Sequence, residues 1–107
     1  MPNLTVTDDS KFQEDVLNSP LPVLAVFKSE WCPSCKRITP VIEKLSDEYI
    51  GRVKFVNVDA IKNVKAAAEN SVLAIPTLLI FKAGKELERQ TGYLPEADLK
   101  ALIDKNL

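Results

Sequence analysis

Histidine is absent from this 107-residue sequence, and cysteine occurs only twice, as Cys32 and Cys35. Zinc and iron–sulfur sites generally need four ligands, so a complete metal site would require a second chain or outside ligands. Basic residues are not in excess, because the 14 Lys and Arg are offset by 15 Asp and Glu and form no basic run. The charge pattern therefore does not indicate a nucleic-acid-binding protein.

The sequence also lacks a long apolar run. The longest, "PVLAVF" and "VLAIPTLLIF", are far shorter than the roughly 20 residues that a transmembrane helix needs. The opening "MPNLTVTDDS" has neither the basic n-region nor the apolar h-region of a secretory signal. We therefore expect a cytoplasmic protein with no membrane role. Without repeats, low-complexity tracts or linkers, residues 1–107 are predicted to form a single domain.

The apolar pattern predicts an α/β fold. Residues 22–28 form a continuous apolar run of strand length, which is typical of a strand covered on both faces. Residues 77–92 indicate a hairpin that turns near Ala83–Gly84, and its mostly charged second arm suits a sheet edge. The other predicted strands are 3–6 and 52–59, and the predicted helices are 8–18, 35–49, 62–70 and 95–107.

The predicted helices have recognisable ends and apolar faces. For 8–18 an Asp or Ser N-cap is expected, with Phe12, Val16 and Leu17 at helical spacing. Pro40 lies inside the second helix, where we expect a kink, and Pro95 is expected in the first turn of the last helix. The second helix has an apolar stripe formed by Ile38, Val41, Ile42, Leu45 and Tyr49.

The order of these elements predicts where a site would form. Alternating strands and helices at the start of the chain imply parallel strands, and the hairpin adds antiparallel strands at one edge. Cys32 and Cys35 come directly after the strand at 22–28, where a helix opens. Sites in open α/β sheets form at the carboxyl ends of strands, so we expect the functional site here.

The two cysteines are spaced for reversible oxidation. At a helix N-terminus, Cys32 lies near unpaired backbone N–H groups and the positive end of the helix dipole, which favour the thiolate. Cys35 follows about one turn later and is close enough to attack a mixed disulfide formed at Cys32. A purely structural disulfide here is a weaker interpretation, because closing so short a loop removes little unfolded-state entropy.

At these residues the sequence resembles thioredoxin. "EWCPSCK" is similar to that family's active-site signature, which has a Trp before Cys-x-x-Cys and a Lys after it. Pro40 matches the family's helix proline, and "IPTLLIFKAGKE" matches the segment with its cis-proline and hairpin. Gly92 and the last helix "ADLKALIDKNL" also match, so the resemblance covers essentially the whole chain.

The resemblance implies a thioredoxin fold, a central mixed five-stranded sheet flanked by four helices, and a set of residue roles. Cys32 would be the nucleophile and Cys35 the resolving thiol, with a redox-active Cys32–Cys35 disulfide. Pro33 and Ser34 would modulate the site. No metal and no organic cofactor would be required. The residues that would bind an extended substrate segment are Trp31, Ile75, Pro76 as a cis-proline, and Gly92.

The sequence departs from the family in two places. Pro33-Ser34 stands where thioredoxins usually have Gly-Pro; Pro33 still suits a first helical turn, and the Ser34 hydroxyl adds a donor near Cys32. Val26 and Phe55 stand where the family commonly buries an Asp and a Lys, so the usual proton acceptor for Cys35 is missing. Lys28 replaces a second aromatic residue.

We therefore interpret the sequence as a thiol–disulfide oxidoreductase of thioredoxin type. Its partners would be protein disulfide substrates and a thioredoxin reductase as electron donor, with no nucleic acid or membrane, and it would be a monomer. One alternative is a glutaredoxin-like, glutathione-dependent enzyme, although the sequence lacks the Gly-Gly expected there. The other is a non-enzymatic binding module or a metal-bridged dimer.

Overall fold

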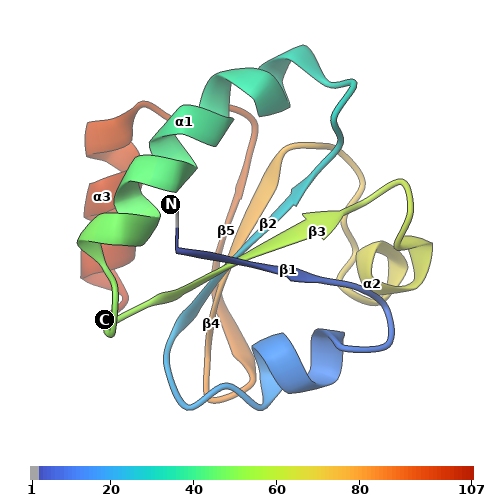
Figure 1. The fold of residues 1–107 in the computed structure, drawn as a ribbon, viewed down its shortest axis with the longest axis horizontal. Helices are drawn as coiled ribbons and strands as arrows, with labels where there is room; N and C mark the ends of the chain where they lie inside the picture. Colours follow the sequence, from blue (N-terminus) through green and yellow to red (C-terminus); the bar gives the residue numbers. More distant parts are fainter. Residues whose placement is uncertain (1–2) are drawn as a thin grey trace.

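A five-stranded sheet with helices on both faces forms the centre of the structure (Figure 1). This computed structural model describes residues 3–107. The elements in chain order are β1 (Leu4–Thr7), η1 (Gln13–Leu17), β2 (Val23–Lys28), α1 (Pro33–Glu48), β3 (Lys54–Asp59), α2 (Val64–Glu69), β4 (Thr77–Lys82), β5 (Lys85–Thr91) and α3 (Glu96–Lys105). The strand order is β1-β3-β2-β4-β5. The predicted mixed sheet with four helices is confirmed.

The first three strands are parallel, and the hairpin adds two antiparallel strands. β3 pairs in parallel with both β1 and β2, whereas β4 is antiparallel to β2 and to β5. The charged strand β5 lies at the sheet edge, as expected. No helix within residues 3–107 has the length and apolar character that crossing a bilayer takes.

β2 is covered on both faces, which accounts for its unbroken apolar run. Successive strand residues point to opposite sides of a sheet. Leu24 and Val26 pack in the core formed with α1 and α3. Val23, Ala25 and Phe27 pack in a second core, which includes residues of η1 and α2. Burial of all five side chains fixes the strand between two layers and holds its carboxyl end in place.

Helix α1 presents its predicted apolar stripe to the sheet. Ile38, Ile42 and Leu45 are buried, and the helix continues through the exposed Pro40 to Glu48. Buried Tyr49, at the end of α1, donates its hydroxyl hydrogen to a carboxylate oxygen of Asp104 on α3. Burial, and then this hydrogen bond, raise the pKa of Tyr49 to about 12. The contact joins the two helices on this face.

For two helices, the residues expected at the N-terminus play a different part in the structure. The helix predicted over 8–18 is only a short π-type turn, η1. The Asp8 carboxylate accepts hydrogen bonds from the backbone N–H groups of Ser10 and Lys11, at 2.9 and 3.0 Å, and so holds a local turn instead of capping a helix. Pro95 is the N-cap of α3 and not part of its first turn, because its backbone is extended, with ψ of 155°.

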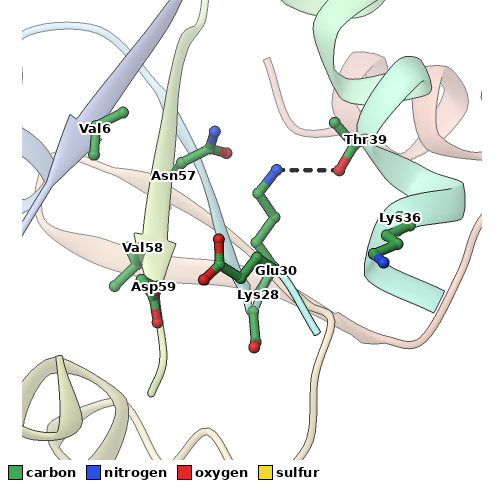
Figure 2. A pocket seen from close by; sticks show the side chains of 9 residues that line it. Val6, Lys28, Glu30, Lys36, Thr39, Asn57, Val58 and Asp59 are labelled. Carbon is green, nitrogen blue, oxygen red and sulfur yellow. Dashed lines mark hydrogen bonds between the residues drawn. The ribbon is translucent and has the colours of Figure 1, made fainter. Parts of the chain in front are cut away.

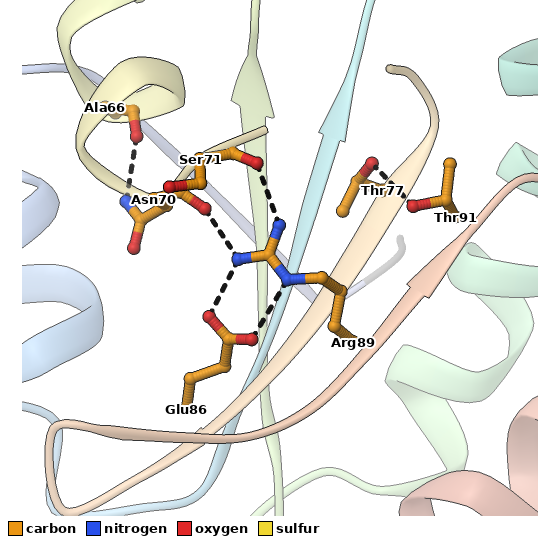
Figure 3. Close-up of polar contacts among 7 residues, drawn as sticks. All are labelled: Ala66, Asn70, Ser71, Thr77, Glu86, Arg89 and Thr91. Atoms are coloured by element: carbon orange, nitrogen blue, oxygen red, sulfur yellow. Dashed lines mark hydrogen bonds and ion pairs between the residues drawn. The ribbon is translucent and has the colours of Figure 1, made fainter. Parts of the chain in front are cut away.

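The β4–β5 hairpin turns at the predicted place and anchors a neighbouring loop. Ala83 and Gly84 both have positive φ, as a two-residue hairpin turn of type I′ requires. Arg89 on β5 donates to the carbonyl oxygens of Asn70 and Ser71 at 2.6 and 3.1 Å, and it also pairs with Glu86 (Figure 3). These bonds hold the segment between α2 and β4, which leads to Ile75 and Pro76.

Replacing Val26 by Asp should destabilise the fold. Val26 is fully buried beside α1, next to Asn57 on β3 and Leu78 on β4. A carboxylate there should lower the unfolding free energy by about 1–4 kcal/mol. Burial raises the pKa of such a carboxyl above its unfolded value, so stability should fall further as pH rises through the folded pKa.

Denaturant unfolding of the reduced proteins at acidic and alkaline pH measures both effects. Val26→Asn is the matched control, since it introduces a polar side chain that does not titrate. Its penalty should not grow with pH in the way that the penalty of Val26→Asp does. A neutral or stabilising effect of Val26→Asp at both pH values would contradict the buried placement.

Candidate active site

The two thiols lie at the start of α1, as predicted. Cys32 is the N-cap residue, with extended backbone (φ −96°, ψ 118°), and Pro33 occupies the first helical turn. The Cys32 sulfur accepts a hydrogen bond from the backbone N–H of Cys35 at 3.3 Å. Cys32 is partly exposed, whereas Cys35 is 1% exposed, and both are free thiols. One sulfur therefore faces solvent and the other faces the protein interior.

The environment of Cys35 keeps its proton bound at neutral pH. Burial, followed by the interaction with the Cys32 side chain, raises the pKa of Cys35 to about 11. The Ser29 backbone and the positive charge of Lys28 act in the opposite direction and lower it. Cys35 is therefore a protonated, neutral thiol at neutral pH.

A second segment, which precedes β4, lies against Cys32. The Ile75–Pro76 peptide bond is cis. The Cys32 thiol donates to the Ile75 carbonyl oxygen at 3.8 Å. Gly92, directly after β5, donates its backbone N–H to the Pro76 carbonyl at 2.8 Å. The structure thus brings together residues of three separate segments, all of which the sequence had indicated.

Gly92 has a backbone requirement of its own. Its φ is +93°, in the region that favours glycine, and a Cβ there would meet no atom within 4 Å. The glycine is therefore needed for the backbone turn that presents its N–H to Pro76. Space is not the constraint at this position.

Trp31 and Ser34 are sequence neighbours of the two cysteines. In the described part of the chain, neither forms a hydrogen bond to a cysteine sulfur. The Trp31 side chain is 80% exposed, and its backbone N–H donates to the Ser29 hydroxyl at 3.3 Å. Ser34 is partly exposed in the first turn of α1. Among residues 3–107, the hydrogen bonds of the Cys32 sulfur go to the backbone of Cys35 and Ile75, and none goes to the Ser34 hydroxyl.

A pocket of about 450 Å³ lies beside the first turns of α1, where Lys36 and Thr39 contribute to its lining (Figure 2). Its lining includes Lys28 at the end of β2, Thr39 on α1 and Asn57 on β3. The Lys28 ammonium donates to the Thr39 hydroxyl at 3.1 Å, and that hydroxyl donates to the Cys35 carbonyl at 2.8 Å. In the sequence, Lys28 was recognisable only as a departure from the family. The signal was a charged residue ending an otherwise apolar strand.

The chain is similar to known proteins over nearly its whole length. The thioredoxin family model matches residues 3–105. Thioredoxin C-2 of Corynebacterium nephridii is 45% identical over 101 residues, which cover 94% of each chain. A thioredoxin of Acidithiobacillus ferridurans is 42% identical over 104 residues, 97% of this chain and 95% of that one. A thioredoxin of Synechocystis sp. is 38% identical over 99 residues, 92% of each chain.

These matches extend over nearly the whole fold, including both thiols and the cis-proline segment. Members of the matched family exchange electrons with protein disulfides and, in general, take them from a reductase. The glutaredoxin-like and non-enzymatic alternatives are therefore not favoured. The chain belongs to the thioredoxin family and is a thiol–disulfide oxidoreductase.

Proposed function

We propose that Cys32 is the nucleophile and Cys35 the resolving thiol in the reduction of protein disulfides. The Cys32 thiolate attacks one sulfur of a substrate disulfide, and the other substrate sulfur leaves and takes up a proton. Cys35 then loses its proton and attacks the Cys32 sulfur. A Cys32–Cys35 disulfide forms and the reduced substrate departs. The contrast between the partly exposed Cys32 and the 1% exposed Cys35 is the observation that carries these roles.

The substrate would lie along the segment beside Cys32. Trp31, Ile75, Pro76 and Gly92 form the proposed binding surface, in which the partly exposed Ile75 offers backbone groups to an extended peptide. The exposed indole of Trp31 adds apolar contact area next to the nucleophile. Pro33 and Ser34, between the cysteines, would modulate the redox properties of the pair.

The wider setting is also part of the proposal. Residues 1–107 would act as one thioredoxin domain and as a monomer in the cytoplasm, where closely spaced thiols are more often catalytic than structural. The electron donor would be a thioredoxin reductase. Neither a cofactor, a nucleic acid nor a membrane has a part in the reaction as proposed.

Insulin reduction tests the overall reaction and its electron donor. The protein should reduce insulin disulfides rapidly with NADPH and a thioredoxin reductase, and much more slowly with reduced glutathione and glutathione reductase. The Cys32→Ser variant is the control for chemistry at the first thiol and should show no catalysis. Faster turnover with glutathione would contradict the proposed donor.

Alkylation of the reduced protein tests the assignment of the two thiols. At neutral pH iodoacetamide should label Cys32 well before Cys35, because Cys35 is buried and has its pKa raised to about 11. A thiol with such a pKa is ionised at pH 7 to roughly one part in ten thousand. Peptide mapping by mass spectrometry measures the two rates. Equal labelling, or earlier labelling of Cys35, would overturn the assignment.

Substitution of each cysteine tests the order of the two steps. Cys35→Ser should accumulate a stable mixed disulfide between Cys32 and insulin, because the thiol that releases the product is missing. Cys32→Ser should accumulate none. Intact-mass measurement after an acid quench detects the adduct, and adducts with the Cys32 variant alone would reverse the mechanism.

A further inference from the structure

Lys28 lies on the face of the sheet that carries α1, at the end of β2. Val26 and Lys28 are two residues apart in one strand and so point to the same face, with Lys28 roughly 7 Å closer to the strand's end. Val26 and Phe55 are both buried in the core on that face, so the core beneath the cysteines holds no charge at these positions. Lys28, the last residue of β2, places a positive charge near the site instead.

The Lys28 ammonium is held toward the helix that carries Cys35. It donates to the Thr39 hydroxyl at 3.1 Å (Figure 2). Thr39 in turn donates to the Cys35 carbonyl at 2.8 Å. Thr39 lies one turn after Cys35 in α1. These two bonds fix the orientation of a long, flexible side chain relative to Cys35.

No carboxylate within residues 3–107 forms an ion pair with this ammonium. The titratable groups that share its pocket are Glu30 in the loop after β2, Lys36 on α1 and Asp59 at the end of β3. With no partner within ion-pair distance, the charge of Lys28 remains available to a nearby anion. The positive charge of Lys28 lowers the pKa of the Cys35 thiol, whereas burial raises that pKa by more.

Water can reach this pocket. Glu30 and Lys36 are exposed at its rim, and the Asn57 amide oxygen is buried without a hydrogen-bond partner in the part of the chain described. In Figure 2 the Asn57 side chain points into the space that Lys28 also enters. The pocket of about 450 Å³ has these polar groups within a mostly apolar lining and is large enough for several water molecules. A proton leaving this region therefore has solvent to accept it.

We propose that Lys28 is a positioning residue for the resolving step, in which its ammonium stabilises the thiolate that forms on Cys35. The inference rests on the proposed role of Cys35. In this step the Cys35 proton passes to solvent, the Cys35 sulfur bonds to the Cys32 sulfur, and the Cys32–substrate bond breaks. The electron pair of that bond leaves on the substrate sulfur, which takes a proton from solvent. Lys28 thus stabilises the thiolate from the end of β2, and no charged residue is needed at position 26.

Single-turnover reduction of a peptide disulfide, acid-quenched and followed by intact mass from pH 6 to 9, tests this role. Lys28→Met should leave formation of the mixed disulfide unchanged and slow its decay about three- to tenfold, as expected for a pKa rise of half to one unit at Cys35. The decay-rate profile should move to higher pH. Lys28→Arg keeps the charge and should decay nearly as fast as the unaltered protein.

Lys82→Met is the control for net charge. Lys82 is exposed at the end of β4, which lies beside the start of β2, whereas the thiols follow the end of β2. This variant should leave both steps unchanged. Equal decay rates and pH profiles for Lys28→Met and the unaltered protein would overturn the role of Lys28, and so would a Lys28→Arg variant as slow as Lys28→Met. Persistence of the mixed disulfide in the unaltered protein would instead overturn the proposed role of Cys35 and the inference with it.

Discussion

Burial of β2 on both faces is the constraint on which the site depends. The strand lies between β3 and β4, and its side chains alternate between a core with α1 and α3 and a core with η1 and α2. A strand held in this way has little freedom to shift, because a slip by one residue would exchange its two apolar faces. The end of β2 is therefore fixed in position, and the loop that leads from Lys28 to Cys32 begins there.

The site itself is assembled from backbone groups at three places in the chain. The first turn of α1 provides the N–H that reaches the Cys32 sulfur, the segment before β4 provides the Ile75 carbonyl, and the residue after β5 ties Pro76 through its N–H. Backbone groups make these contacts, so many side-chain changes around them leave the geometry intact. The chemistry then depends on the two sulfur atoms and the charges close to them.

Charge near the buried thiol is placed at the end of the sheet and not in its core. A buried ion pair at positions 26 and 55 would have to offset the cost of removing two charges from water. Val26 and Phe55 avoid that cost and contribute apolar contacts instead. Lys28, half-buried beside the pocket, donates its ammonium to Thr39, and its positive charge lowers the pKa of Cys35. This arrangement separates the stability of the core from the electrostatics of the site.

Features that depend on local pattern could be predicted from the sequence alone. The apolar run of β2, the stripe on α1, the turn at Ala83–Gly84 and the spacing of the cysteines were all predictable, because periodicity and backbone preference act over a few residues. The resemblance supplied the positions of Ile75, Pro76 and Gly92.

The folded structure was needed to find the interactions between segments that are far apart in the chain. It shortened the predicted helix at 8–18 to η1, since Asp8 holds a turn of its own. It joined Lys28 to Thr39 and left the Asn57 oxygen buried without a partner in the described residues. It also raised the pKa of Cys35, which burial sets first. Burial, hydrogen bonding and the electric field at a sulfur atom all depend on groups that are close in space. Many of those groups are far apart in the sequence, so a short stretch of sequence does not contain them.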